Sequence, residues 1–200
     1  HCSIHDNPVV GLGYGVTVST GAYVLVTDNE MGDCRHCLSS NDAVNNGSGP
    51  YRPSHWEFLH NHVHDAKWNH HQQPVLDSHP GFKAESTFVI EGNAFDSTEA
   101  PAIGLNSGSG RIRGNQFSNL YTGIWIYNAT NQGVTGAPNN ITIEGNRFVN
   151  VQDPYDISGA NTANITIDGT AAPTTRQRRA AVPPMISLQP MGADNILRWQ

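Results

Sequence analysis

Val-Ile-Glu-Gly-Asn-Ala-Phe, at residues 89–95, decides the fold of this chain because closely similar heptapeptides occur at residues 111–117 and 142–148. The shared core of the three copies is Ile-x-Gly-Asn-x-Phe, and fixed self-similarity of this kind indicates a repeat architecture. Fainter copies lie upstream. The asparagines that anchor the six copies are Asn7, Asn29, Asn61, Asn93, Asn115 and Asn146. Their successive spacings are 22, 32, 32, 22 and 31 residues, which predicts a solenoid of roughly 22-residue coils with inserted loops of about ten residues.

The alignment places apolar residues in three columns. Residues two apart share one face of a strand, so these columns are expected to point inward. The column three before each asparagine holds Ile4, Val26, Phe58, Ile90, Ile112 and Ile143; the column five before holds Cys2, Val24, Trp56, Phe88, Gly110 and Ile141; and the column two after holds Val9, Met31, Val63, Phe95, Phe117 and Phe148.

The asparagines themselves are expected to end each strand, because asparagine tolerates left-handed backbone in turns. Stacked coils would bring their amides into a ladder. An outward column of Glu91, Arg113 and Glu144 alternates in sign, which favours pairing between neighbouring coils.

This repeat resembles the right-handed parallel β-helix of the pectate-lyase-like superfamily, in its parallel β-helix repeat branch. The resemblance implies an all-β, single-stranded helix of three sheets and about six to seven coils. It also implies a secreted or cell-surface protein that acts on polysaccharide. The superfamily includes lyases, hydrolases, epimerases, tailspikes and adhesins, so the fold does not determine the chemistry.

The repeat pattern divides the chain into a β-helix at residues 1–170, a linker at 171–184 and the beginning of a second, β-rich domain at 185–200. A complete inward strand at residues 2–4 predicts that the helix is truncated at its N-terminal end, since solenoids need terminal caps.

Composition excludes several partners. The net charge of −6 argues against nucleic acid, and no apolar run reaches the roughly 18 residues of a membrane span. We expect a monomer. Cys2 aligns far from Cys34 and Cys37, so a disulfide from Cys2 is not expected. The Cys34–Cys37 spacing resembles a redox or zinc pair, with free thiols as the alternative.

Reactive residues gather in the irregular half of the chain. All ten histidines lie at or before His79, and seven of them lie between His55 and His79. Loop insertions at residues 41–55 and 66–73 carry arginine, tyrosine, tryptophan and histidine. Loops on a rigid scaffold are a usual place for function.

Aligning Val16, Leu38 and Leu76 predicts one outward column of Thr17, Ser39 and Asp77 and a second of Ser19, Asn41 and His79. We predict that Arg35 holds a substrate carboxylate bidentately. His79 or His36 would be the base near neutral pH. The predicted catalytic residues are Arg35, His36, Asp77 and His79, and the predicted substrate-binding residues are Tyr14, Tyr51, Trp68 and Lys83.

The resemblance then implies proton abstraction beside a carboxylate followed by β-elimination, as in polysaccharide lyases. Hydrolysis by Asp77 with a second carboxylate ranks lower because the sequence shows no convincing partner. The alternatives are a non-catalytic adhesion or structural protein and a metal-binding β-helix.

The spacing of His60, His62 and His64 resembles a zinc or copper motif. Asn61 is expected to interrupt strand alternation, so the three imidazoles need not share a face. A divalent metal is therefore an alternative, and no other cofactor is expected.

Overall fold

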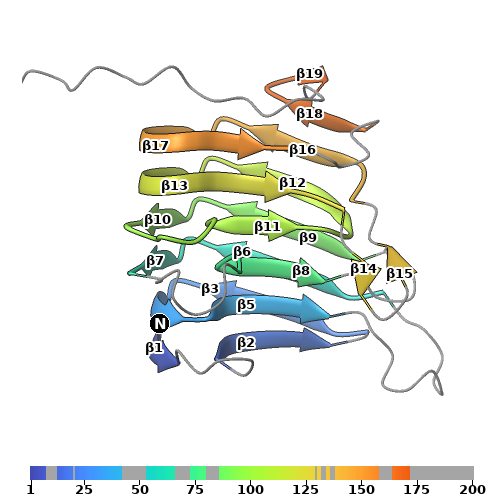
Figure 1. Cartoon of the computed structure of the whole chain (residues 1–200). Coiled ribbons are helices and arrows are strands. Elements are labelled where there is room, and N and C mark those ends of the chain that lie inside the picture. The colour runs from blue at the N-terminus through green and yellow to red at the C-terminus, as the bar shows by residue number, and fades with distance from the viewer. Residues whose placement is uncertain are drawn as a thin grey trace, which may run out of the picture.

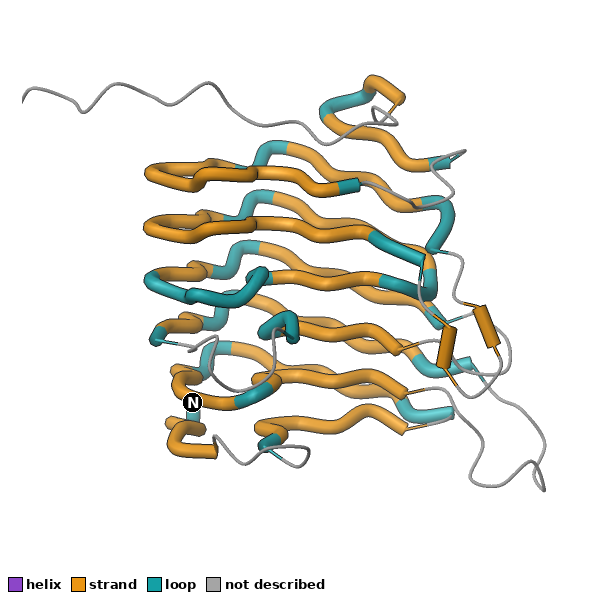
Figure 2. Tube along the Cα trace, in the orientation of Figure 1, coloured by secondary structure: helices purple, strands orange, loops and turns teal. Residues whose placement is uncertain are grey.

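The computed structural model describes residues 1–7, 13–19, 21–41, 53–65, 73–79, 86–128, 130–131, 134–135, 138–157 and 164–171. The elements of this part are β-strands, which wind into a stack of coils (Figure 1). The tube view shows the coils as successive rungs joined by turns (Figure 2). Within these ranges, no helix has the length and apolar character needed to cross a bilayer.

Three parallel ladders run along the stack, one for each side of a coil. The first ladder consists of β3 (Tyr23–Thr27), β6 (His55–Leu59), β9 (Thr87–Glu91), β12 (Ser109–Arg113), β16 (Ile141–Glu144) and β18 (Ile165–Ile167). The second ladder begins with β1 (Ser3–Asn7), β4 (Glu30–Cys34), β7 (His62–His64) and β10 (Ala94–Asp96). The third ladder begins with β2 (Tyr14–Ser19), β5 (His36–Asn41), β8 (Leu76–His79) and β11 (Ile103–Leu105).

The second and third ladders merge in the later coils. Both β13 (Gln116–Ile126) and β17 (Arg147–Asp156) run through the corner as single long strands. β10 pairs with the first part of β13 and β11 with its last part, while β17 pairs along nearly all of it. Within the described residues these strands form six coils, and β18 begins a seventh, in agreement with the predicted six to seven coils. A small antiparallel pair, β14 (Thr130–Asn131) and β15 (Val134–Thr135), lies in the loop after β13.

From the second coil onward, the predicted columns line one continuous interior. Trp56 stacks on Phe88, and Phe95, Phe117 and Phe148 stack in a row with ring centroids 5.1 and 4.8 Å apart. Each fully buried side chain of this size contributes about 1.5–3 kcal/mol relative to exposure. Gly110 breaks the first-ladder column because a Cβ there would collide with the carbonyl and ring of Phe88.

The asparagine ladder is also present, and it is a bonded network. The Oδ1 of Asn93 accepts the backbone N–H of Asn61 at 2.8 Å, and the Nδ2 of Asn93 donates to the Phe58 carbonyl at 2.8 Å. The same arrangement joins Asn29 to Asn61, Asn93 to Asn115 and Asn115 to Asn146. Asn61, Asn93 and Asn115 are buried, so the ladder supplies hydrogen bonds where water does not reach.

The anchor asparagines were expected to adopt the left-handed backbone conformation themselves, and this prediction was wrong by one position. The left-handed residue is the one before each anchor, as at Asp28 (φ 58°), His60 (φ 55°) and Gly92 (φ 67°). A second left-handed column marks the next corner of the coil and includes Asp33 and Asp65. The anchor asparagine therefore serves through its side chain, while the preceding residue turns the chain.

The register of the first coil was also wrong. Ser3 pairs with Glu30, so Cys2, and not Asn7, stands at the anchor position, and the Cys2 N–H donates to Asn29 Oδ1. Asn7 pairs with Cys34 at the second corner. Asp6 has φ 61°. The dipeptide Asp6-Asn7 therefore resembles the first-corner sequence Asp28-Asn29, because both corners of a coil need a left-handed residue. Val9, placed in an apolar column, lies outside the described residues.

The last described strands of the stack are β18 and β19 (Thr170–Ala171). β18 pairs in parallel with β16 and then in antiparallel fashion with β19. The Asp168 carboxylate accepts the Gly145 N–H. The predicted linker beyond Ala171 and the second domain lie outside the described residues.

On the outer face of the first ladder, Arg113 Nη2 lies 2.6 Å from Glu91 Oε1. This contact lowers the pKa of Glu91, and it confirms the predicted pairing of these two residues.

Candidate functional site

The outer side of the third ladder carries the predicted polar column. Thr17 pairs with Ser39, Ser39 with Asp77, and Asp77 with Gly104. The neighbouring inward residues Leu38 and Leu76 are fully buried, so the alternation of the strands sends this column outward. The sequence alignment of the third ladder was therefore correct.

His36 and Asp77 form the centre of this surface, and both side chains are wholly buried. His36 Nδ1 lies 2.6 Å from the Pro74 carbonyl. A carbonyl oxygen only accepts, so Nδ1 carries a proton. The other ring nitrogen, Nε2, lies 3.7 Å from Asp77 Oδ2. Pro74 passes so close over Gly104 that a Cβ at residue 104 would overlap its ring.

Tyr14 and Arg35 join the same cluster from its outer edge. The Tyr14 ring stacks on the His36 ring, with centroids 5.4 Å apart and planes 12° apart. Arg35 Nη1 donates to the Tyr14 hydroxyl at 2.9 Å. Both side chains are partly exposed. The structure thus brings Tyr14, Arg35, His36 and Asp77 into one connected group.

Tyr127 completes the cluster, and the sequence analysis missed it. Its hydroxyl lies 3.5 Å from Asp77 Oδ1 and accepts from Asn106 Nδ2 at 3.1 Å, while its ring stacks on Trp125 at 3.8 Å. A signal was present, because Asn106 and Tyr127 follow the aligned strand ends Leu105 and Ile126 and so extend the column predicted from His79.

Burial, together with the Asp77 carboxylate, raises the pKa of Tyr127 above its ordinary value. Above about pH 10 the unfolded chain releases the tyrosine proton while the folded chain keeps it. The unfolded state then binds fewer protons, so the free energy of unfolding falls as pH rises, by up to about 1.4 kcal/mol per pH unit from this group.

We expect Tyr127→Phe to remove this contribution. Denaturant midpoints at about pH 9 and about pH 11 should converge more closely in Tyr127→Phe than in the unmodified chain. Tyr121 is half exposed, so Tyr121→Phe is the matched control and should keep the original slope. Equal slopes in all three proteins would contradict the assignment.

Several predicted residues cannot be placed. Tyr51, Trp68 and Lys83 lie outside the described residues, as does the side chain of His79. The backbone of His79 ends β8 and pairs with Asn41, as the alignment required.

A family model described as a right-handed β-helix region matches residues 1–172. The chain belongs to the right-handed β-helix family. No curated protein and no solved structure gives a significant match. Membership accounts for the ladders and the handedness of the coil, whereas the chemistry of a right-handed β-helix protein must come from its side chains.

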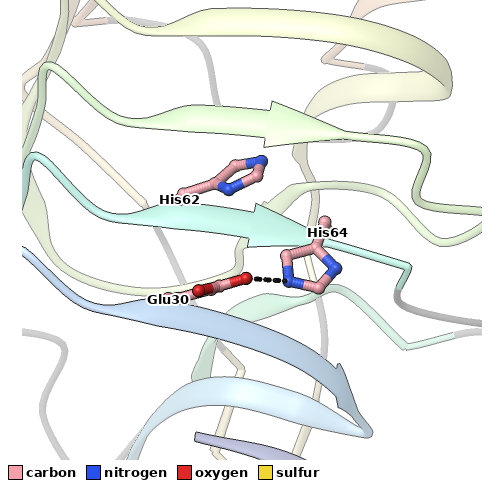
Figure 3. Close-up of side chains that lie close together, drawn as sticks. All are labelled: Glu30, His62 and His64. Atoms are coloured by element: carbon pink, nitrogen blue, oxygen red, sulfur yellow. Dashed lines mark ion pairs between the residues drawn. The ribbon is translucent and has the colours of Figure 1, made fainter. Parts of the chain in front are cut away.

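The second ladder of this right-handed β-helix protein carries a further cluster. His62 and His64 project from β7 beside Glu30 of β4 (Figure 3). The predicted third histidine, His60, is not in this group, because it occupies the left-handed turn position before Asn61. Glu30 was missed, although it follows Asn29 just as His62 follows Asn61.

The first ladder carries an exposed group that the sequence analysis did not single out. Tyr23, 69% exposed, donates from its hydroxyl to Glu57 Oε1 at 2.7 Å. The Tyr23 ring stacks on His55, whose Nδ1 lies 2.6 Å from Thr87 Oγ1. The hydrogen bond from Tyr23, more than any other contact, lowers the Glu57 pKa, so this carboxylate stays ionised in mildly acidic solution.

The three cysteines are free, as expected for Cys2, which is exposed. Cys34 and Cys37 are buried. The Cys37 thiol lowers the pKa of Cys34 to about 7, and the same contact together with burial raises the pKa of Cys37. Among the described residues neither cysteine belongs to a group of three metal-ligating side chains.

Proposed function

We propose that this right-handed β-helix protein is carbohydrate-active, binds an acidic polysaccharide along the outer side of the third ladder, and cleaves it by β-elimination. A secreted or cell-surface location goes with this role. The observation that carries the proposal is the placement of Arg35, a partly exposed guanidinium fixed by Tyr14 at the edge of a buried polar cluster.

Arg35 suits a carboxylate ligand for a geometric reason. Its hydrogen bond to the Tyr14 hydroxyl uses one of five N–H donors, and the Tyr14 ring lies beneath the guanidinium, with Cζ 5.4 Å from the ring centroid. A planar guanidinium held this way can offer two parallel donors to one carboxylate. The net charge of −6 on the whole chain makes a fixed cation at the site more important for attracting an acidic glycan.

The proposed reaction needs a base, and burial divides the candidate histidines. His36 is buried, its Nδ1 donates to the Pro74 carbonyl and its ring stacks on Tyr14, so its role is to position Tyr14 and Arg35. His79, at the end of β8, is the proposed base. It takes the proton from the carbon next to the carboxylate, a carbon–carbon double bond forms, and the bond to the leaving sugar oxygen breaks. Arg35 stabilises the negative charge that develops on the carboxylate.

The test is a panel of acidic and neutral polysaccharides incubated with the full chain and followed by the ultraviolet absorbance of the unsaturated product. We expect product from an acidic glycan. Arg35→Lys should lower kcat/KM at least about tenfold, because lysine offers no bidentate contact. Arg111→Lys, on the outer face of the first ladder, is the matched control and should retain full activity. Absence of unsaturated product from every glycan, or equal activity of the two variants, would overturn the lyase assignment.

The complete burial of His36 and Asp77 favours one second candidate, a glycan-binding surface without turnover. In that case calorimetry would show saturable binding that Arg35→Lys weakens and Arg111→Lys does not, while no unsaturated product forms. Binding unaffected by Arg35→Lys would exclude this candidate as well.

A further inference from the structure

The cluster on the second ladder is built from two neighbouring coils. Glu30 pairs with His62, and Gly32 pairs with His64, so the three side chains occupy adjacent positions on one outer face. One ligand atom from each lies within 4.8 Å of the other two. Figure 3 shows both imidazoles and the carboxylate on the same side of β4 and β7.

The hydrogen bonds around His64 aim its second ring nitrogen at Glu30. His64 Nδ1 lies 2.9 Å from Asp65 Oδ2, and a carboxylate only accepts, so Nδ1 carries a proton. Nε2 faces Glu30 Oε1, 3.2 Å away. The ring nitrogen that could bind a metal ion therefore lies beside a carboxylate oxygen that could bind the same ion.

Two features of the backbone hold His64 in this position. Asp65 adopts the left-handed conformation of the second corner, with φ 53°, which keeps its carboxylate beside its own neighbour's ring. Gly32 leaves the space that the ring occupies, because a Cβ at residue 32 would approach His64 Cε1 to 2.9 Å. A carboxylate that fixes the tautomer of a histidine is the usual outer partner of a metal-bound imidazole.

We propose that Glu30, His62 and His64 bind one divalent transition-metal ion, with Asp65 orienting His64. Two imidazoles and one carboxylate suit zinc, copper, nickel or iron better than magnesium or calcium, which prefer oxygen ligands throughout. The cluster is accessible, with Glu30 51% and His64 28% exposed. Three protein ligands leave positions for water or a ligand, as in sites where a metal is reactive.

His60 is outside this site although it belongs to the same short sequence. Its turn position separates it from the strand face that His62 and His64 share. The proposal also stands apart from the glycan site, because the two clusters lie on different ladders and share no residue. A chain that binds no polysaccharide could still bind the metal, and the reverse also holds.

The test uses the full chain freed of metal with a chelator and titrated with Zn²⁺ by calorimetry and with Co²⁺ by visible absorbance. We expect one saturable Co²⁺ site with ligand-field bands. Of the ten histidines, the eight outside the site should add only weak binding. His62→Ala and His64→Ala should each lower the affinity at least about tenfold. Asp65→Asn should lower it by about tenfold as an outer partner.

His60→Asn is the matched control, because asparagine tolerates the left-handed turn, and it should bind metal like the unmodified chain. Circular dichroism confirms that each variant is folded, and only proteins that bind should show a higher melting temperature with Zn²⁺. The proposal is overturned if no site saturates at one ion per chain, if His62→Ala and His64→Ala bind normally, or if His60→Asn loses binding as they do.

Discussion

Replacing Asn93 by alanine is expected to lower the free energy of unfolding by about 3–5 kcal/mol. The Asn93 amide is 1% exposed. Its oxygen accepts from the backbone and side-chain N–H groups of Asn61, and its nitrogen donates to Phe58 O and Asn115 Oδ1. Alanine leaves these groups without partners in the interior, where each costs about 1–3 kcal/mol before the structure relaxes.

Guanidinium chloride unfolding followed by circular dichroism measures this change. Gln116→Ala is the matched control, because Gln116 is an exposed amide one residue beyond the neighbouring anchor, and it should cost less than about 0.5 kcal/mol. A loss below about 1 kcal/mol for Asn93→Ala would mean that the turn does not depend on the ladder.

Phe117→Ala is expected to be equally severe, at about 3–5 kcal/mol. The ring is completely buried between Phe95 and Phe148, with centroids 5.1 and 4.8 Å away. Removing it loses both stacking contacts and leaves a cavity that β10 and β17 can close only by moving against their ladder bonds. The aromatic pairs add about 0.5–1.5 kcal/mol each beyond the area they bury.

Phe117→Leu separates volume from stacking, because leucine fills part of the space and should cost less than about half as much as alanine. Denaturant midpoints of the two variants and the unmodified chain provide the comparison. Similar stabilities for Phe117→Ala and the unmodified chain would show that the interior repacks, and the row of rings would then carry little of the stability.

Much of the fold could be predicted because the repeated motif Ile-x-Gly-Asn-x-Phe places both the isoleucine column and the phenylalanine column of the core. Ile90, Ile112 and Ile143 and the phenylalanines after each anchor follow a strict spacing, and that spacing survives loop insertions. The first coil failed because Asp6 and Asn7 suit either corner. Local turn chemistry cannot distinguish two corners that both need a left-handed residue, and only the pairing of Ser3 with Glu30 separates them.

The site was only partly predictable for a different reason. Register alone placed Asp77 beside Ser39 and His79 beside Asn41. It could not show that the Tyr127 hydroxyl lies beside Asp77, because this contact spans 50 residues and depends on side-chain direction across two coils. Glu30 follows its anchor asparagine as His62 does, so the alignment contains it. The spacing of the histidines instead includes His60, whose left-handed turn conformation removes it from the strand face.

The asparagine ladder has a practical consequence for engineering. Its links span 32 residues between Asn61 and Asn93 but only 22 between Asn93 and Asn115, and the N–H to Oδ1 distances, 2.8 and 2.9 Å, are the same within 0.1 Å. Rung spacing is thus set locally, independently of how much chain each rung carries elsewhere. Foreign peptides inserted into the long connections between strands should therefore leave the stack of coils intact. The chain could then display inserted epitopes at a constant distance from one another.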